Sequence, residues 1–191
     1  MPDTTPDPDH AAGLAIRAIN ASRAPIDALF DLLRDVYTTS DQMSETLADR
    51  CPGAPALAAE IDAVRRTGPG ALFLVAETHA RPCGYLIVRP RAQTRLRHTA
   101  DLQMGVHSTA RGRGVGRRLL DTALERLACE GVVEIVYLMV RADNHPALAL
   151  YAAAGFERLA TLQRDTRIDN RYYDGVLLRR FVRPPAGRTT F

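Results

Sequence analysis

Three glycines occupy alternate positions, Gly112, Gly114 and Gly116, in the stretch ARGRGVGRRLL. Glycine leaves neighbouring backbone N–H groups uncovered and tolerates positive φ, so successive amides can form a concave site for an anion. The pattern of a helix begins directly afterwards, and a helix N-terminus carries about half a positive charge. Interleaved arginines add positive charge, so the stretch predicts a site for a phosphate or pyrophosphate. The alternative is a tight turn in front of an arginine-rich helix.

Two well-known phosphate-binding loops do not match this stretch. A Walker loop ends in Gly-Lys-Ser or Gly-Lys-Thr, but the chain has no lysine, and its 25 basic residues are all arginine. The dinucleotide fingerprint requires the spacing GxGxxG after the first strand of a βαβ unit. Here the spacing is GxGxG, and the preceding segments have the pattern of antiparallel strands. The lack of lysine also excludes Schiff-base and lysine-nucleophile chemistry.

Two stretches, in order along the chain, carry the most specific motifs. In the first, Arg111, Gly114 and Gly116 match the pattern of Arg or Gln, two residues, Gly, one residue, and Gly or Ala. In the second, NHPALALYAAAGF, the matching residues are Asn144, Ala147, Leu150, Tyr151, Gly155 and Phe156. Both resemble signatures of the GCN5-related N-acetyltransferase (GNAT) superfamily. The resemblance extends over about residues 14–182 and includes a final hairpin in IDNRYYDGVLLRRFV.

The resemblance implies that acetyl-CoA is the cosubstrate and that no metal takes part. In the family, the strand before the glycine loop carries a bulge whose backbone binds the pantetheine arm and the thioester carbonyl. Gly105 suits such a bulge or a close backbone approach, with tight packing as the alternative. The implied cofactor-binding residues are Met104, Gly105, Val106, Arg111, Gly112, Arg113, Gly114, Val115, Gly116, Asn144 and Tyr151. For Asn144, capping of the following helix is an additional role.

Acetyl transfer to an amine requires a neutral amine, a donor for the oxyanion and protonation of the departing thiolate. An alkyl amine has a pKa near 10.4, so well under ~1% is neutral at pH 7. By resemblance, Tyr151 is the proton donor to the thiolate, with a core tyrosine as the alternative. Asp101 stands where many relatives carry Glu and is the expected base, acting through water because Asp is one methylene shorter. Alternative bases are His98, His107 and Glu77.

The stretch RPRAQTRLRH places four arginines, Arg89, Arg91, Arg95 and Arg97, between two predicted strands. It fits two interpretations. One is a solvated, arginine-rich hairpin. In the other, one or two of these arginines face the acceptor groove and hold a carboxylate through a bidentate pair, which would favour an amino acid over a polyamine. Acceptor specificity is otherwise expected to come from residues 35–70 and from the strand ends.

The expected function is that of an acetyl-CoA-dependent N-acetyltransferase that moves an acetyl group directly to a primary amine of a small molecule. Amino acids, polyamines and amine antibiotics or toxins are the acceptors considered. One alternative is a protein acetyltransferase acting on an N-terminus or lysine, and another is a non-catalytic acyl-CoA-binding regulatory domain. Nucleic acid is not an expected partner, because aromatic residues do not interleave with the arginines and the net charge is only +3. A homodimer is the one assembly considered.

Hydrophobic periodicity predicts the elements that position these residues. Helices are expected over 24–37, 54–70, 115–130 and 144–155, and strands over 14–20, 71–78, 84–90, 98–106, 133–140 and, as a pair, 156–182. The run VEIVYLMV (133–140) has the pattern of a strand buried on both faces. This order predicts an α+β protein of the GNAT fold, in which a central mixed, mostly antiparallel sheet is flanked by helices.

The length and composition predict one domain with a sizeable core, because the chain has 191 residues of which 46% are hydrophobic. We expect this domain over 13–183, a disordered leader over 1–12 and a loose tail over 184–191. The acidic, proline-rich start lacks the features of a signal peptide. The chain also lacks a run of eighteen apolar residues, so no membrane association is expected, and the expected location is cytoplasmic.

Overall fold

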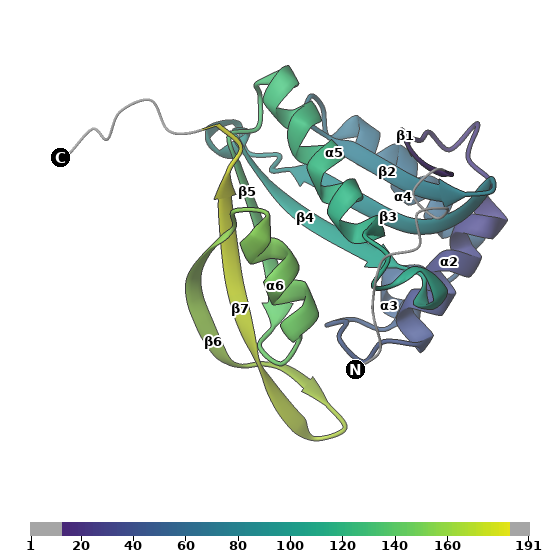
Figure 1. Ribbon diagram of the computed structural model, residues 1–191. Coiled ribbons are helices and arrows are strands. Elements are labelled where there is room, and N and C mark those ends of the chain that lie inside the picture. The colour runs from purple at the N-terminus through teal and green to yellow at the C-terminus, as the bar shows by residue number, and fades with distance from the viewer. Residues whose placement is uncertain (1–12, 184–191) are drawn as a thin grey trace.

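The computed structural model describes residues 13–183 and shows a central sheet with helices on both of its faces (Figure 1). The expected leader over 1–12 and the expected tail over 184–191 lie outside the described residues. The elements, in chain order, are β1 (Leu14–Ala18), α2 (Ile26–Thr38), α3 (Leu47–Arg50), α4 (Ala54–Arg66), β2 (Leu72–Thr78), β3 (Arg81–Pro90), β4 (Thr99–Val106), α5 (Val115–Glu130), β5 (Ile135–Arg141), α6 (His145–Ala153), β6 (Glu157–Ile168) and β7 (Arg171–Phe181).

Local sequence signals account for most of these bounds. Helix α5 has the bounds predicted for it and lies between two glycines in the left-handed conformation, Gly114 with φ 78° and Gly131 with φ 70°. Glycine adopts this conformation without the penalty that a Cβ brings. The helix expected over 54–70 ends earlier, at Arg66. Gly68 and Gly70 both have positive φ, which is incompatible with a continuing helix.

The sheet has the strand order β1-β2-β3-β4-β5-β7-β6. All neighbouring strands are antiparallel except β4 and β5, which are parallel. The prediction of a mixed, mostly antiparallel sheet flanked by helices is therefore confirmed.

Strands β4 and β5 separate after a short paired stretch. They pair only from Thr99 to Asp101 on β4, opposite Ile135 to Tyr137 on β5. β4 nevertheless stays paired with β3 as far as Val106, and β5 stays paired with β7 as far as Arg141. The backbone groups of β4 beyond Asp101 that face β5 are therefore not satisfied by the sheet and are available to a ligand.

The bulge expected in β4 is not present in its pairing with β3, which runs from Ala100 to Val106 without a register shift. Gly105 instead allows close packing. A Cβ at this position would lie 2.7 Å from Tyr85 Cε1 and 2.9 Å from Val36 Cγ1. Tight packing against Tyr85 and Val36, the alternative to a bulge, therefore accounts for Gly105. The opening towards β5 arises because β4 and β5 diverge.

Helices cover the two faces of the sheet unequally. Helices α5 and α6 lie on one face and share a core with side chains from β2 to β5 and β7 (Figure 1). Helices α2 and α4 lie on the other face, where their core includes strand residues of β2 and β3 and none of β5, β6 or β7. The expectation that residues 133–140 are buried on both faces is therefore wrong, and Met139 has an exposed fraction of 42%.

No helix in residues 13–183 combines the length and apolarity needed to cross a membrane. Within the same residues, no group of three or more His, Cys, Asp or Glu side chains is placed to hold a metal ion.

Candidate active site

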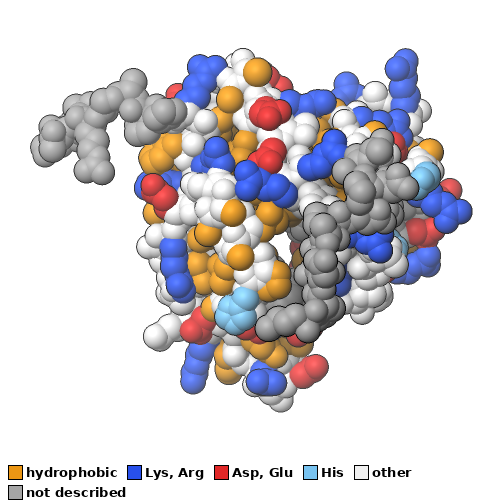
Figure 2. All heavy atoms as spheres, in the orientation of Figure 1, with side chains coloured by type: hydrophobic (Ala, Val, Ile, Leu, Met, Phe, Trp, Pro, Cys, Tyr) orange, Lys and Arg blue, Asp and Glu red, His pale blue; other side chains and the backbone are white. Residues whose placement is uncertain are grey.

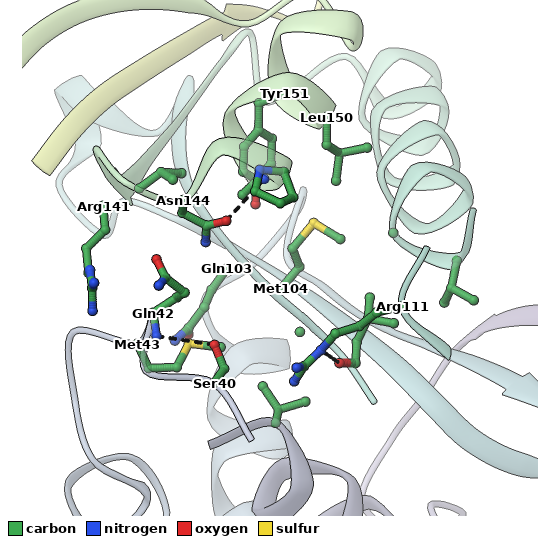
Figure 3. A pocket seen from close by; sticks show the side chains of 18 of the residues that line it. Ser40, Gln42, Met43, Gln103, Met104, Arg111, Arg141, Asn144, Leu150 and Tyr151 are labelled. Carbon is green, nitrogen blue, oxygen red and sulfur yellow. Dashed lines mark hydrogen bonds between the residues drawn. The ribbon is translucent and has the colours of Figure 1, made fainter. Parts of the chain in front are cut away.

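A cavity of about 620 Å³ opens where β4 and β5 separate. Figure 2 shows the surface hollowed beside α6, on the side of the molecule that carries α5. The volume lies in the usual range for small-molecule sites. The walls come from β4, the glycine loop, the end of β5, α6 and the segment 40–44 between α2 and α3 (Figure 3).

The structure brings together nearly all of the residues predicted to bind the cofactor. Ten of them line the cavity: Met104, Gly105, Val106, Arg111, Gly112, Gly114, Val115, Gly116, Asn144 and Tyr151. Arg113 is not among the lining residues. Residues from β4 and from α6 thus meet across the gap in the sheet, although they lie about 40 positions apart in the sequence. Their contact with a cofactor stays a prediction.

The glycine loop leaves the N-terminus of α5 open towards the cavity. Gly112 has φ 73° and Gly114 has φ 78°, and a Cβ at either position would meet nothing within 4 Å. The first helical hydrogen bond runs from the Arg118 N–H to the Gly114 carbonyl at 3.1 Å. The N–H groups between these two residues have no partner within the helix, so this end of α5 can bind an anion.

Arg111 does not turn its guanidinium towards the glycine loop. Its Nε donates to the Val106 carbonyl at 3.1 Å, and its Nη atoms donate to the Thr39 carbonyl at 3.2 Å and to Thr39 Oγ1 at 2.7 Å. Arg111 therefore ties the loop after β4 to the C-terminal end of α2. Asp35 makes a second tie, accepting from the Ser108 N–H at 2.6 Å and from the Ser108 hydroxyl at 2.7 Å.

The bonds from Ser108 keep the Asp35 carboxylate charged. Burial by itself would raise the pKa of this carboxyl, but the backbone and hydroxyl donors of Ser108 outweigh it and hold the pKa below its usual value. We expect Asp35→Asn to destabilise the fold at pH 7 by about 1–2 kcal/mol, because the variant loses a charged acceptor. Stabilisation by the charged carboxylate is complete above the ordinary Asp pKa of about 3.9 and is lost as pH falls through the lower pKa of the folded state.

Thermal unfolding at several pH values checks this prediction. The difference in Tm between wild type and Asp35→Asn should shrink as the pH is lowered below about 3.9. The exposed Asp31, whose side chain is 64% accessible, provides the control variant Asp31→Asn. A Tm difference that stays constant over the whole pH range would contradict the assignment.

Tyr151 is the one predicted acid–base residue that lines the cavity. It is buried, and its ring packs edge-on against Phe156 with centroids 5.4 Å apart. Burial raises the pKa of the hydroxyl well above its ordinary value, so the group stays protonated at neutral pH. Asn144 directly precedes α6, the helix that carries Tyr151, and caps it by accepting from the Ala147 N–H at 3.2 Å. The capping role predicted for Asn144 is therefore confirmed.

The predicted bases lie outside the cavity. The Asp101 side chain is 59% exposed, and its two oxygens accept from Arg91 at 3.1 and 3.3 Å. Glu77 on β2 pairs at 2.6 Å with Arg17 on β1, an edge strand of the sheet, and β3 separates β2 from β4. His107 caps the turn after β4, accepting from the Thr109 N–H. His98 lies before β4. Among the described residues that line the cavity there is no aspartate, glutamate or histidine.

The four arginines at and after the end of β3 do not line the cavity either, which favours the interpretation of a surface hairpin over that of a carboxylate clamp. Arg89 forms an ion pair with Glu60, and Arg91 pairs with Asp101. Arg95 and Arg97 are exposed in the connection, at the opposite end of β4 from Gly105. Nothing in the sequence indicated that Arg89 pairs with Glu60, because Glu60 lies on α4, 29 positions away.

Sequence analysis missed the residues that form the second half of the cavity. They are Ser40, Gln42, Met43 and Ser44 from the segment after α2, Gln103 from β4, and Met139 and Arg141 from β5. No motif marks them. The only signal was the expectation that acceptor specificity comes from residues 35–70 and the strand ends, which includes the segment 40–44.

Arg141 holds the segment after α2 next to β5. Its side chain is only 3% exposed, and its Nε and Nη2 donate to the two carboxylate oxygens of Asp143 at 3.0 and 2.5 Å. Its Nη1 donates to the backbone carbonyl of Asp41, and its guanidinium lies 3.7 Å from the centre of the Tyr173 ring. Arg141 is thus fully engaged in fixing the cavity wall.

Gln103 is held in a fixed orientation on the same wall. Its Nε2 donates to Glu45 Oε1 at 3.0 Å, and its Oε1 accepts from Arg89 at 3.4 Å. Glu45 also accepts from the Tyr37 hydroxyl at 2.9 Å. Burial, followed by the nearby Tyr85 and Glu45, raises the pKa of Tyr37, so its hydroxyl remains a donor at neutral pH. A neutral amide supported by a charged network therefore faces this half of the cavity.

Comparison with known proteins finds relatives of the whole chain and of parts of it. The sequence model described as the acetyltransferase (GNAT) family matches residues 26–156. The L-amino acid N-acetyltransferase AaaT of Escherichia coli is 26% identical over 171 residues, which cover 90% of this chain and 94% of AaaT. The N-alpha-acetyltransferase RimI of Mycobacterium tuberculosis is 48% identical over 65 residues, which cover 34% of this chain and 39% of RimI.

A solved structure agrees over nearly the whole length. The acetyltransferase yncA from Salmonella typhimurium, in a structure with its cofactor acetyl-CoA, has a TM-score of 0.79 at 19% identity and covers 92% of this chain and 97% of its own. This likeness confirms the predicted fold. The local sequence matches are shorter, and the chain spans between 18% and 39% of the length of three such curated relatives.

Proposed function

The chain belongs to the acetyltransferase (GNAT) family, and on this premise we propose that it transfers the acetyl group of acetyl-CoA to the primary amine of a small molecule. The single observation that carries the proposal is the opening between β4 and β5, closed at one end by the glycine loop of α5. The match to the amino acid acetyltransferase AaaT, which extends over nearly both whole chains, supports a small acceptor.

The residues present fit acetyl-CoA. The open N-terminus of α5 and the bare glycine loop suit its pyrophosphate, since a Cβ at Gly112 or Gly114 would project into open space. The backbone groups of β4 beyond Asp101 that face β5, apart from the Val106 carbonyl that accepts from Arg111, suit the amide groups of the pantetheine arm. When bound, acetyl-CoA supplies an acetyl group activated as a thioester.

In this proposal, the chain's own groups do three things. Unpaired N–H groups of β4 stabilise negative charge that develops on the carbonyl oxygen, as preorganised donors do in acyl transfer. The protonated hydroxyl of Tyr151 gives its proton to the departing sulfur. Asp101 takes a proton from the amine. It lies on the same face of β4 as Gln103, which lines the cavity two residues away, but Asp101 itself lies outside the cavity, so the proton passes through water.

The role of Asp101 can be tested by replacing it with asparagine. We expect kcat/KM for the amine to fall about tenfold, below the 10²–10⁴ range of direct acid–base catalysis because water intervenes. The control is Asp31→Asn, since Asp31 is exposed to a similar extent, on α2. If Asp101→Asn has the same kcat/KM as wild type, Asp101 is not the base, and its pairing with Arg91 has only a structural role.

Acetylation of a protein N-terminus is a second candidate, favoured by the local match to RimI. One experiment distinguishes the candidates: a thiol-release assay with acetyl-CoA against amino acids, polyamines, alkylamines and short peptides. Small amines should release thiol at a higher kcat/KM than peptides. Release with peptides alone would support the second candidate. Tight binding of coenzyme A without thiol release for any acceptor would indicate a non-catalytic binding domain.

A further inference from the structure

The face of β5–β7 opposite α6 is not covered by any helix of the described residues. On β5, Val136, Leu138 and Val140 belong to the core that contains α6. Successive side chains of a strand point to opposite faces, so Tyr137, Met139 and Arg141 lie on the other face. The core beneath α2 and α4 includes no residue of these strands, and Figure 1 shows both helices behind the β1–β4 half of the sheet.

Apolar side chains form a row across this face. Met139 is paired with Leu177 on β7, and Leu177 is paired with Ala160 on β6. Paired residues share a face, and so does Leu162, which lies two residues beyond Ala160. Met139 and Leu162 are 42% and 41% exposed. We call Met139, Leu177, Ala160 and Leu162 the apolar strip. It is continuous with the cavity, because Met139 also lines the cavity.

Two of the charged side chains that border the apolar strip are arginines with acidic partners, and a third charged group, the Asp165 carboxylate, lies over Gly175 opposite Leu162. Arg179 pairs with Glu157 at 3.0 Å at one end of the strip. At the cavity end, the buried guanidinium of Arg141 is occupied by Asp143 and by the Asp41 carbonyl. Arg141 therefore presents no open bidentate site for the carboxylate of an acceptor. In Arg179, Nη2 is taken by Glu157, and Nε, which has no hydrogen-bond partner among the described residues, is buried.

Two uncharged amides lie near the cavity end of the strip. Gln42 and Gln103 lie with Met43 on the wall opposite Asn144 and Tyr151 (Figure 3). The Oε1 atom of Gln42 is buried and has no hydrogen-bond partner among the described residues. A buried acceptor without a partner is costly, so a donor from a ligand is expected to satisfy it. An amine N–H is such a donor.

We propose that the acceptor is a primary amine with an uncharged, apolar substituent, such as an alkylamine or arylalkylamine. The amine enters the cavity beside Gln42 and Gln103, and the substituent lies along the apolar strip from Met139 towards Leu177. This inference rests on the proposed function and adds the class of acceptor. A polyamine fits less well in the cavity itself, because no carboxylate lines it within the described residues. The Asp165 carboxylate lies outside the cavity, over Gly175 and opposite Leu162. An amino acid fits less well, because the neighbouring arginines are occupied.

A series of linear alkylamines from ethylamine to heptylamine provides the test. If the chain of the acceptor lies on the apolar strip, kcat/KM should rise by about two- to fourfold for each added methylene until the strip is covered. Phenethylamine should be preferred over phenylalanine by at least about tenfold, and hexylamine over spermidine by a similar factor. A flat dependence on chain length, or a preference for phenylalanine or spermidine, would overturn the inference.

A variant of the strip provides a second readout. Leu177→Gln should lower kcat/KM for hexylamine about fivefold and change that for ethylamine less than about twofold, because Leu177 belongs to the strip but does not line the cavity. Calorimetric binding of N-acetylhexylamine to the complex with coenzyme A should weaken by a similar factor, independently of turnover. Leu96→Gln is the control, because Leu96 is 37% exposed in the β3–β4 connection, away from the cavity.

The outcomes separate this inference from the proposed function. Acetyl transfer to amines that does not depend on chain length or on Leu177 would leave the proposed function standing and overturn the apolar acceptor. Absence of transfer to every amine, with coenzyme A bound, would overturn the proposed function and with it the inference. An equal loss for hexylamine and ethylamine in Leu177→Gln would show that the side chain supports the sheet and does not bind the substituent, which would overturn the inference.

Discussion

Tyr151→Phe is expected to lower kcat about 100-fold and to leave the affinity for acetyl-CoA unchanged. The substitution removes only the hydroxyl, which lines the cavity and which burial keeps protonated at neutral pH. Without it, the sulfur must leave as a thiolate or take its proton from water. The loss of a positioned acid typically costs 10²–10⁴-fold, and the low end applies because a thiol with a pKa near 8.5 is already a fair leaving group.

Single-turnover kinetics measures this effect at the chemical step and avoids masking by product release. The control is Tyr85→Phe, because Tyr85 is also fully buried but lies outside the cavity. Burial raises the pKa of Tyr85 to about 12, so both hydroxyls are protonated under assay conditions. Tyr85→Phe should retain kcat within about twofold. Wild-type single-turnover rates in Tyr151→Phe would assign Tyr151 to the core alone.

Gly114→Val is expected to weaken coenzyme A binding at least about 100-fold. Gly114 has φ 78° at the start of α5, a conformation that a β-branched residue adopts only with strain. A Cβ there would meet nothing within 4 Å of the protein, so the isopropyl group would project into the space in front of the helix N-terminus. Both effects act on the proposed pyrophosphate site, because the substitution would either block the anion or distort the N–H groups that we propose to bind it.

Calorimetry with coenzyme A tests this prediction, and the opposite end of the same helix supplies a matched control. Gly131 also has a left-handed φ, 70°, at the C-cap of α5. Gly131→Val therefore brings a similar backbone strain, of about 1–3 kcal/mol, without approaching the cavity. Both variants should lose a similar amount of Tm, while only Gly114→Val should lose coenzyme A affinity. Unchanged affinity in a folded Gly114→Val protein would remove the glycine loop from the binding site.

The sequence by itself determined the parts of this protein that depend on neighbouring residues. Helix α5 and its glycines are local features, since apolar periodicity and a left-handed glycine at each end define the helix within one segment. The same holds for the cap of α6 at Asn144, whose partner Ala147 is three residues away. These two segments supply the glycine loop and Tyr151, so the half of the cavity that we propose for the cofactor could be located from the sequence.

The tertiary structure alone decided which side chains pair and which face of the sheet stays open. Arg89 meets Glu60 and Arg141 meets the Asp41 carbonyl across 29 and 100 positions, and no local pattern encodes such partners. The apolar run of β5 predicts burial on both faces, yet Met139 is exposed because α2 and α4 pack only on β1–β4. Periodicity reports what a strand can bury, whereas the coverage of each face depends on where distant helices dock. That docking leaves open the side of the cavity that we propose for the acceptor.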